Sequence, residues 1–534
     1  MVSPVVLATL SARLATFVFR SVRRAFGLVA MASSTELQSE DRIVPDSVIP
    51  HGDLPALRYR NLPEPVPLRR MIGPSIMLAG LALGSGEFIL WPYITYRSGF
   101  VFFWACLLGV TTQYFMNMEI ARWTLATGES AITGFCRISR HWGPVFLALN
   151  IIPWMIPAWS KGAAQLVSWL IWPEQAGTGH SPYVTELSVG GLIVCGLILT
   201  AGPVIYETVE KIQLFLVTLV IVSVIVLALW LVRGDAVQAM IAGSANLGGL
   251  PPMDPKVITW TFLLGALAFA GAGGTLNLGQ SNYIKDKGYG MGRHIGRITS
   301  PITGQEESVA EIGFHFPEDD ANLRRWSQWW KAACIEHFVS FYLTCILCLV
   351  LLTLIAYSIF YTADGSLADN AHHYVNDISF VWGEAVTIEE MLGHGFRLLF
   401  LVMGVAILLT TEFGVLDATS RISTDIVKVN WLKDNKRFSE SRLYYLFLWG
   451  TIGLGITILV VGDQQAGAFV LFKLTAALNG GVMFLYCGLL LYMNRTRLPR
   501  AIRINGWRSA ILVWAVCFFG LFAIWAIYDK LAPG

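Results

Sequence analysis

An acidic residue follows three small residues in the middle of a long apolar segment. Residues 71–97 are long enough to cross a bilayer, which takes about 20 apolar residues, and their centre reads Gly84-Ser85-Gly86-Glu87. Glycine favours unwinding of a helix, and hydrocarbon does not tolerate a carboxylate. Backbone without helical hydrogen bonds is tolerated at that depth only where it is buried in protein or lines a water-filled cavity. The pattern therefore predicts a site for a small polar cargo, with Glu87 as the metal, cation or proton ligand.

A second apolar segment is interrupted in the same way. Residues 257–283 contain Gly271, Gly273 and Gly274, and Asn277 follows. Half-helix N-termini offer N–H groups to anions, and unwound carbonyls offer oxygens to cations. The backbone of both breaks would then complete the site, with Asn277 as a weaker candidate. The alternative is that these glycines mark close helix packing.

The composition places the chain among membrane proteins. Of its 534 residues, 55% are hydrophobic and 14% are charged, and the net charge is +2. Soluble domains are about 25% charged. The charge balance gives no indication of a nucleic-acid partner. The sequence shows no nucleotide-binding motif and no nucleophile–base pair, so we expect neither an enzyme nor a cofactor. The expected partners are the lipid bilayer and a small ion or molecule.

The apolar runs predict an all-α polytopic membrane protein with about 11 transmembrane helices. They lie near 71–97, 100–122, 144–172, 187–205, 212–232, 257–283, 334–360, 396–420, 443–462, 466–493 and 509–528. The two interrupted runs each open a block of five spans, 71–232 and 257–493, and residues 509–528 add one helix. Five spans per block make the second block enter from the opposite side, which predicts an inverted repeat with broken helices 1 and 6.

Lys and Arg predict the orientation. They are concentrated in residues 1–70, 284–333 and 421–442, which then lie in the cytoplasm. We therefore expect a plasma (inner) membrane protein with a cytoplasmic N-terminus and an external C-terminus. Within residues 1–70, the first 30 are weakly amphipathic, translation could also begin at Met31, and the remainder is predicted to be mostly disordered.

Ionisable residues inside the spans are the next candidates. Lys161, Glu412, Asp417 and Lys473 lie within apolar runs. Each costs about 2.5–3.5 kcal/mol at a helix centre, so each should have a partner in the interior. Lys473 could pair with Glu87, which would make a proton the switch. Alternatively, Lys473 is a structural ammonium bonded to carbonyl groups.

Three further acids lie near predicted helix ends. Glu119 is expected to pair with Arg122 three residues later. Glu207 and Glu210 lie at a helix start, where dipole compensation explains them as well as a proton exit does. The candidates for a proton pathway are Glu119, Lys161, Glu207, Glu210, Glu412 and Asp417. The cytoplasmic stretch with Trp326, Trp329 and Trp330 predicts a helix that rests at the membrane interface.

The chain resembles a divergent member of the Nramp-type (natural resistance-associated macrophage protein) divalent metal transporter family. Gly73-Pro74 is similar to the opening of the family's first helix, the stretch from Gln113 to Gly128 to its second, and Tyr206–Glu210 to the start of its fifth. The likeness is diffuse over about residues 70–500. It implies the fold of the amino acid/polyamine/organocation superfamily and proton-linked transport of a divalent cation.

The departures from that family concern its metal ligands. In register, the family's metal-binding Asp is Gly84 and its Asn is Glu87, while its Met-Pro-His signature becomes Gly274-Thr275-Leu276. Without a thioether the preference for manganese or iron has no physical basis. Glu87 and backbone carbonyls offer only hard oxygens, which favour a cation such as Mg²⁺.

The same segment also resembles a second group. Gly84-Ser85-Gly86, followed by an apolar residue and Phe88, is similar to the first helix of amino acid/polyamine/organocation transporters, except at Glu87. That likeness implies proton-coupled transport of an amino acid or another small organic zwitterion or cation. A third hypothesis is a non-transporting sensor that uses the same fold.

Overall fold

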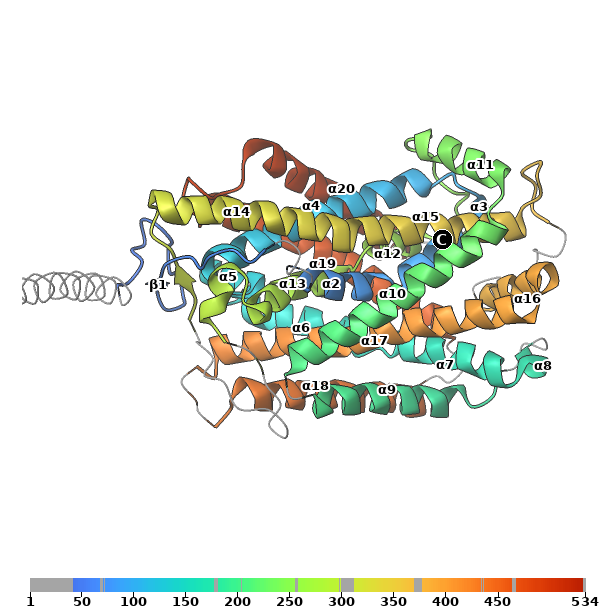
Figure 1. Ribbon diagram of the computed structural model, residues 1–534, viewed down its shortest axis with the longest axis horizontal. Coiled ribbons are helices and arrows are strands. Elements are labelled where there is room, and N and C mark those ends of the chain that lie inside the picture. Colours follow the sequence, from blue (N-terminus) through green and yellow to red (C-terminus); the bar gives the residue numbers. More distant parts are fainter. Residues whose placement is uncertain are drawn as a thin grey trace, which may run out of the picture.

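The protein is an all-α polytopic membrane protein (Figure 1). The computed structural model describes residues 42–67, 71, 73–176, 181–202, 204–254, 258–296, 298, 312–368, 377–433, 435, 437–462 and 467–531. Within these residues, nine helices are long and apolar enough to cross a membrane. The less apolar helix α4 and the pair α12–α13 pack into the same bundle. They correspond to the two remaining predicted spans.

The helices follow the predicted order along the chain. Those of the first half are α2 (Pro74–Ala82), α3 (Trp91–Ser98), α4 (Phe103–Thr127), α5 (Ala131–Ile138), α6 (Trp142–Trp154), α7 (Ala158–Ile171), α8 (Pro173–Ala176), α9 (Val184–Ala201), α10 (Ile205–Leu231) and α11 (Gly234–Ala245). Those of the second half are α12 (Trp260–Ala268), α13 (Gly274–Lys287), α14 (Asp320–His337), α15 (Thr344–Phe360), α16 (Phe380–Leu392), α17 (His394–Asn430), α18 (Glu440–Val461), α19 (Ala468–Thr496) and α20 (Gly506–Leu531).

The first predicted break is present. Helix α2 ends at Ala82, and a π-helical turn, η2 (Gly86–Leu90), leads into α3. Gly86 is required by a close approach to the other break, since a Cβ there would lie 1.6 Å from the carbonyl oxygen of Phe269. The second break separates α12 from α13 between Ala268 and Gly274. The two interruptions therefore face each other inside the bundle.

The 37-residue helix α17 is the central support of the bundle. It packs against α6, α7, α10 and α18, and also against the first half-helix, α2. Figure 1 shows α10 crossing α17 diagonally in front of the bundle. The division into two five-span repeats stays a prediction.

Helix α14 corrects the expectation of an interfacial helix. It continues through a second π turn, η4 (Phe338–Leu343), into α15, so residues 320–360 form one long element. Trp326 and Trp329 are buried, and the indole N–H of Trp329 donates to the carbonyl of Pro63, 2.8 Å away. These tryptophans face folded protein because the N-terminal segment covers them.

The predicted disorder of residues 1–70 is wrong for residues 42–67, which we call the N-terminal strap; residues 1–41 lie outside the described part. Its strand β1 (Arg58–Tyr59) pairs in parallel with β2 (Phe314–His315). The apolar side chains that it buries are Val44, Ile49, Leu54, Leu57 and Leu62. Each such burial contributes about 1.5–3 kcal/mol, which offsets the entropy lost on ordering a polar, proline-containing segment.

Candidate binding site at the two helix breaks

A small cavity with room for about one water molecule lies where the two breaks meet. Both interruptions, the end of α6, the start of α7 and the middle of α17 contribute to its wall. Its lining residues are Leu81, Ala82, Gly84, Ser85, Gly86, Trp154, Trp159, Phe269, Gly271, Ala272, Leu276 and Thr411. The breaks therefore enclose a space that continuous helices would fill.

Three aromatic side chains form one wall of this cavity. The ring centroids of Trp154 and Trp159 lie 5.5 Å apart, and Phe269 lies 6.0 Å from the first and 5.8 Å from the second. The indole N–H of Trp154 donates to Thr275 Oγ1 at 2.7 Å, whereas Nε1 of Trp159 is buried without a partner in the described structure. The sequence interpretation missed these tryptophans. Their signal was a pair of Pro-flanked tryptophans within one span, at Pro153-Trp154 and Pro157–Trp159.

Few polar side chains reach the cavity. Ser85 is 2% exposed and its hydroxyl has no partner among the described residues. The hydroxyl of Thr411 donates to the carbonyl of Leu83 at 3.2 Å. Among the residues that the structure describes, no charged side chain lines this space. The site thus offers aromatic faces, one unpartnered hydroxyl and the backbone of the breaks.

Glu87 lies beside the cavity and does not line it. Its side chain is 1% exposed, its Oε2 accepts a weak hydrogen bond from the N–H of Gly84 at 3.3 Å, and its Oε1 has no partner in the described part of the chain. We expected this carboxylate to point into the cavity. The turn that unwinds the helix instead folds the carboxylate back onto its own backbone. Its role as a metal or proton ligand stays a prediction.

The hypothesised pair between Glu87 and Lys473 is absent. Lys473 lies on α19 with its ammonium nitrogen 5.2 Å from the ring centroid of Phe469 and 6.0 Å from that of Phe262. Over the described ranges, no ion pair joins this ammonium to Glu87. The lysine is therefore placed among aromatic rings and away from the first break.

Gln113 of α4 holds the second break in its open shape. Its Nε2 donates to the carbonyls of Leu267 at 3.3 Å and Ala268 at 2.9 Å, where α12 ends. Its Oε1 accepts from the N–H of Gly273 at 3.3 Å and from Nδ2 of Asn277 at 3.2 Å, where α13 begins. Asn277, a candidate ligand, thus takes part in this support. The signal for Gln113 was an amide within an apolar span.

Glu119 belongs to a buried ionic cluster outside the cavity. The predicted pair with Arg122 is confirmed, with 2.6 Å between Oε2 and the guanidinium Nε. Arg508 of α20 also approaches this carboxylate, at 3.1 Å. Two guanidinium groups therefore hold Glu119, which gives it a clear structural role.

The acids near the start of α10 also lie away from the cavity. Glu207 is in the first turn of α10, and Glu210 accepts two contacts of 2.7 Å from the ammonium of Lys287 on α13. This pair joins α10 to the second half-helix. It explains Glu210 without a proton exit.

The acids within α17 have separate partners. Glu412 accepts from the N–H of Ser160 at 3.0 Å, close to Lys161 in the sequence of α7. Asp417 accepts from Nε of Arg421 at 2.9 Å and from the hydroxyl of Tyr444 at 2.7 Å. Within the described chain, no group of three His, Cys, Asp or Glu residues has the geometry of a metal site. A role for these candidates in proton movement stays a prediction.

The sequence matches no protein-family profile and no curated protein. Solved structures do share the fold. A point mutant of the Eremococcus coleocola manganese transporter is 11% identical, with 88% of this chain and 90% of that chain covered and a TM-score of 0.60. The same transporter in complex with an aromatic bis-isothiourea substituted compound gives the same values. MhsT in complex with L-phenylalanine is 14% identical, with 86% of this chain and 97% of that chain covered, and its TM-score is 0.45.

Proposed function

We propose that this protein is a secondary-active transporter whose cargo is a small organic solute. The observation that carries the proposal is the cavity between two helix breaks, walled by aromatic rings and free of charged side chains over the described residues. Its fold is similar to that of a manganese transporter. No feature of the cavity suggests an enzyme.

The chemistry of the wall favours an organic cargo over a bare metal ion. Small-molecule sites are mostly apolar and aromatic, with a few placed polar groups. A hard dication instead requires about six oxygen ligands, usually with carboxylates among them. Here the polar groups are the hydroxyl of Ser85 and the backbone at the end of α2 and the start of α13. Helix starts favour carboxylates and helix ends favour cations, so these groups suit the two charges of a zwitterion such as an amino acid. Binding such a cargo requires the cavity to widen from the space of about one water molecule that it has here.

Glu87 is the proposed coupling residue for protons. Its Oε1 lacks a partner in the described structure although the side chain is buried next to the first break. A buried carboxylate without an ionic partner is costly, and a proton removes that charge. The coupling would then act beside the cargo and not as one of its ligands. The proposed setting is the plasma membrane, with the strap in the cytoplasm, since Lys and Arg gather at that end.

Divalent-cation transport is the second candidate. It is favoured by the fold, which resembles a manganese transporter, and by the hard oxygens of Glu87. It requires the carboxylate to turn into the cavity in another state of the transporter. The cation would then be Mg²⁺ in preference to Mn²⁺, because the described site contains no thioether ligand. A non-transporting sensor is the third candidate.

Uptake into proteoliposomes tests these proposals. We expect counterflow of a labelled amino acid or small zwitterion from a mixed pool, and no flux of Mn²⁺ or Mg²⁺. Trp159→Ala should lower this counterflow at least about tenfold, which is about 1.4 kcal/mol. Trp230→Ala is the matched control, since Trp230 is 65% exposed. Metal flux that disappears in Glu87→Gln would support the second candidate, and no flux of either kind would support a sensor.

A further inference from the structure

The N-terminal strap lies across the end of the bundle where β1, α5 and the start of α14 are found (left in Figure 1). We call it the basic end, because it holds Arg137, Lys285, Lys287 and Arg421. Helix α14 binds the C-terminal part of the strap. The N–H of Leu62 donates to Oδ1 of Asn322 at 2.9 Å, and Trp329 donates to the carbonyl of Pro63. The strap then continues along the chain to the first half-helix, α2. Helix α14, which contacts both the strap and the start of α2, is the described link between them.

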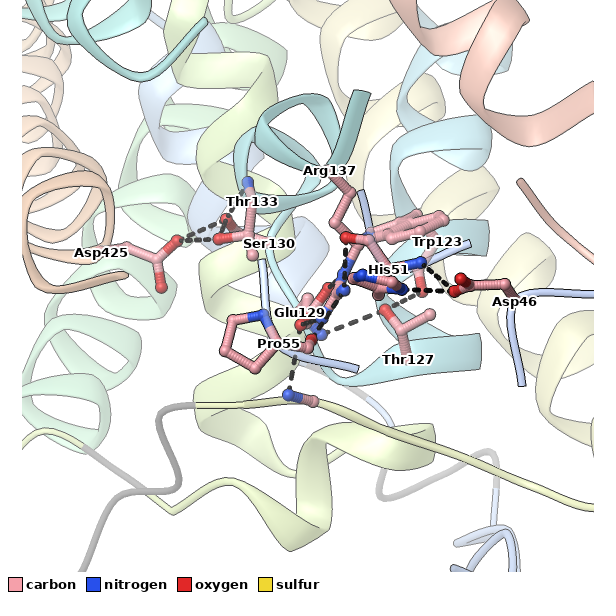
Figure 2. A network of polar contacts seen from close by, with 11 residues as sticks. Asp46, His51, Pro55, Trp123, Thr127, Glu129, Ser130, Thr133, Arg137 and Asp425 are labelled. Carbon is pink, nitrogen blue, oxygen red and sulfur yellow. Dashed lines mark hydrogen bonds and ion pairs between the residues drawn. The ribbon is translucent and has the colours of Figure 1, made fainter. Parts of the chain in front are cut away.

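Arg137 of α5 is the main anchor of the strap. Its Nη1 donates to the carbonyls of His51 at 3.2 Å and Pro55 at 2.9 Å. Its other nitrogens pair with both carboxylate oxygens of Glu129, at 2.7 and 2.6 Å (Figure 2). The guanidinium is 1% exposed. Such two-pronged, charge-assisted contacts are among the strongest hydrogen bonds in proteins and fix geometry as well as distance.

Gly52 lets the strap come this close. Its φ is +61°, and a Cβ there would lie 1.9 Å from the carbonyl oxygen of Arg137. Because the obstacle is backbone, no side-chain rotation relieves the clash. A side chain at this position must therefore lift the strap, while leaving every charged group of the bundle intact.

The anchor connects to the second half-helix through a chain of polar contacts. At the start of α5, the hydroxyls of Ser130 and Thr133 both donate to Oδ2 of Asp425 on α17, at 2.5 and 3.0 Å. Oδ1 of Asp425 accepts from the ammonium of Lys285 on α13 at 2.7 Å. Figure 2 shows Asp425 beside Ser130 and Thr133, and His51 and Pro55 of the strap beside Arg137 and Glu129. The strap, α5, α17 and α13 thus form one connected network.

The first half-helix is fastened at the same end. The N–H of Ser75, at the start of α2, donates to Glu336 at 3.2 Å, and its hydroxyl bonds the same carboxylate. Glu336 belongs to α14, the helix that also holds the strap. The two half-helices that lead from the breaks toward the basic end are therefore bound to α14 and α17. Helix α14 also holds the strap, and α17 binds the start of α5, the helix on which the strap is anchored.

We propose that residues 42–67 are a latch that keeps the cavity closed toward the basic end of the bundle. The seated strap holds α5 through Arg137. Asp425 and Lys285 connect α5 to α13, and Glu336 of α14, the helix that also holds the strap, binds Ser75 of α2. Opening on this side requires the strap to release. The inference rests on the proposed transport function only in that the latch would control transport. The effect of the strap on the two half-helices can be measured without any cargo.

Hydrogen exchange of the full-length protein in lipid nanodiscs tests the latch. Gly52→Val should unseat the strap, so we expect exchange about tenfold faster or more in residues 74–82 and 274–287 as well as in the strap. The matched control is Gly248→Val, because Gly248 also has a positive φ, of +87°, but no atom lies near its added Cβ. The control should leave both half-helices unchanged.

A second variant keeps the result interpretable. Arg137→Gln removes the anchor from the bundle side and should loosen the same two segments. Arg397→Gln breaks a partly exposed pair with Glu389, which does not contact the strap, and should leave both segments unchanged. Faster exchange confined to the strap would overturn the proposal, as would unchanged exchange throughout Gly52→Val. Either of these exchange results would leave the proposed transport function unaffected. Conversely, if the variants loosen both half-helices but the wild type transports nothing in liposomes, the latch is supported and the transport function is not.

Discussion

The middle of the bundle and its basic end differ in how they treat buried charge. Around the cavity, Ser85 Oγ, Glu87 Oε1 and Trp159 Nε1 have no partner within the described structure. At the basic end, Arg137 and Arg421 each meet a carboxylate inside the protein. Unpartnered groups in a dry interior are costly unless a ligand satisfies them. Unpartnered buried atoms also occur at the basic end, among them Nη2 of Arg421 and Nε2 of His315. The two regions differ in their ion pairs: over the described residues Glu87 has none, whereas Arg137 and Arg421 each have one. The middle therefore keeps a carboxylate available to a proton or ligand, and the arginines hold helices together at the basic end.

This contrast also explains which changes should matter most. Breaking a buried ion pair leaves an uncompensated charge, whereas a partly exposed pair is screened by water. The basic end contains both kinds. Comparing them tests whether closure depends on the buried network or merely on the number of charges.

The largest effect is expected at Arg421. This side chain is fully buried on α17, and it bonds Asp417 through Nε at 2.9 Å and Asp286 of α13 through Nη1. Arg421→Met leaves two carboxylates without their cation, so we expect a loss of about 3–5 kcal/mol in the free energy of unfolding. Thermal unfolding in detergent measures it as a lower Tm.

A neutralised version of the same site separates charge from packing. Arg421→Met combined with Asp286→Asn and Asp417→Asn should recover much of the lost stability, because no lone charge remains. If the triple variant is as unstable as Arg421→Met, packing and not charge is the cause. The basic end would then differ from the middle of the bundle in its packing and not in its buried charges.

The next effect concerns pH at the strap. His315 of β2 is fully buried; its Nδ1 lies 3.0 Å from the carbonyl oxygen of Ala126, and its Nε2 has no partner in the described region. Burial lowers its pKa from 6.5 to about 4. As pH falls from 6.5 to 4 the unfolded chain takes up a proton that the folded chain refuses, so stability falls across that window. The loss is on the order of 3 kcal/mol, at about 1.36 kcal/mol per unit of pKa.

His315→Gln checks the origin of this pH dependence. Glutamine keeps a donor for the carbonyl of Ala126 and does not titrate between pH 6.5 and 4. The difference in Tm between the wild type and this variant should therefore change with pH across that window. A constant difference would show that His315 does not sense pH and that other groups cause any acid loosening of the strap.

A smaller effect on stability, but a clear one on transport, is expected at Gln113. Gln113→Leu leaves the carbonyl of Ala268 and the N–H of Gly273 without this partner. Each unsatisfied buried group costs about 1–3 kcal/mol, and the break can avoid that cost by changing shape. We therefore expect counterflow to fall at least about tenfold and exchange in residues 265–280 to rise. Thr111→Val, two residues earlier on α4 and with its hydroxyl next to that of Tyr342, should leave both unchanged.

The sequence predicted the spans and both breaks because these follow from local composition. A run of apolar residues must cross the bilayer, and glycines next to Glu87 or Asn277 interrupt a helix wherever they stand. The direction of the Glu87 side chain was not predictable, because it depends on how the turn after Ala82 folds back. The same holds for Trp159, whose position in the cavity follows from the packing of α7 against α17.

The order of the N-terminal strap is a second feature that the sequence did not predict. Residues 42–67 are polar and contain several prolines, and composition alone predicts disorder for such a segment. Its order depends on contacts remote in sequence, such as Arg137 to Pro55 and Trp329 to Pro63. Spaced apolar residues such as Leu54 and Leu57 were the available signal. Periodicity rules do not detect them, because the strap is neither a regular helix nor a long strand.

The smallest effect is expected at the partly exposed pair of Glu210 and Lys287. It joins α10 to α13 at 2.7 Å, but the two side chains are 16% and 25% exposed. Glu210→Gln should therefore cost no more than about 1 kcal/mol, and the loss should shrink further in high salt. A change in Tm as large as that of Arg421→Met would mean that water does not screen this pair. The pair would then belong to the same buried network as the neighbouring Lys285 and Asp286 of α13.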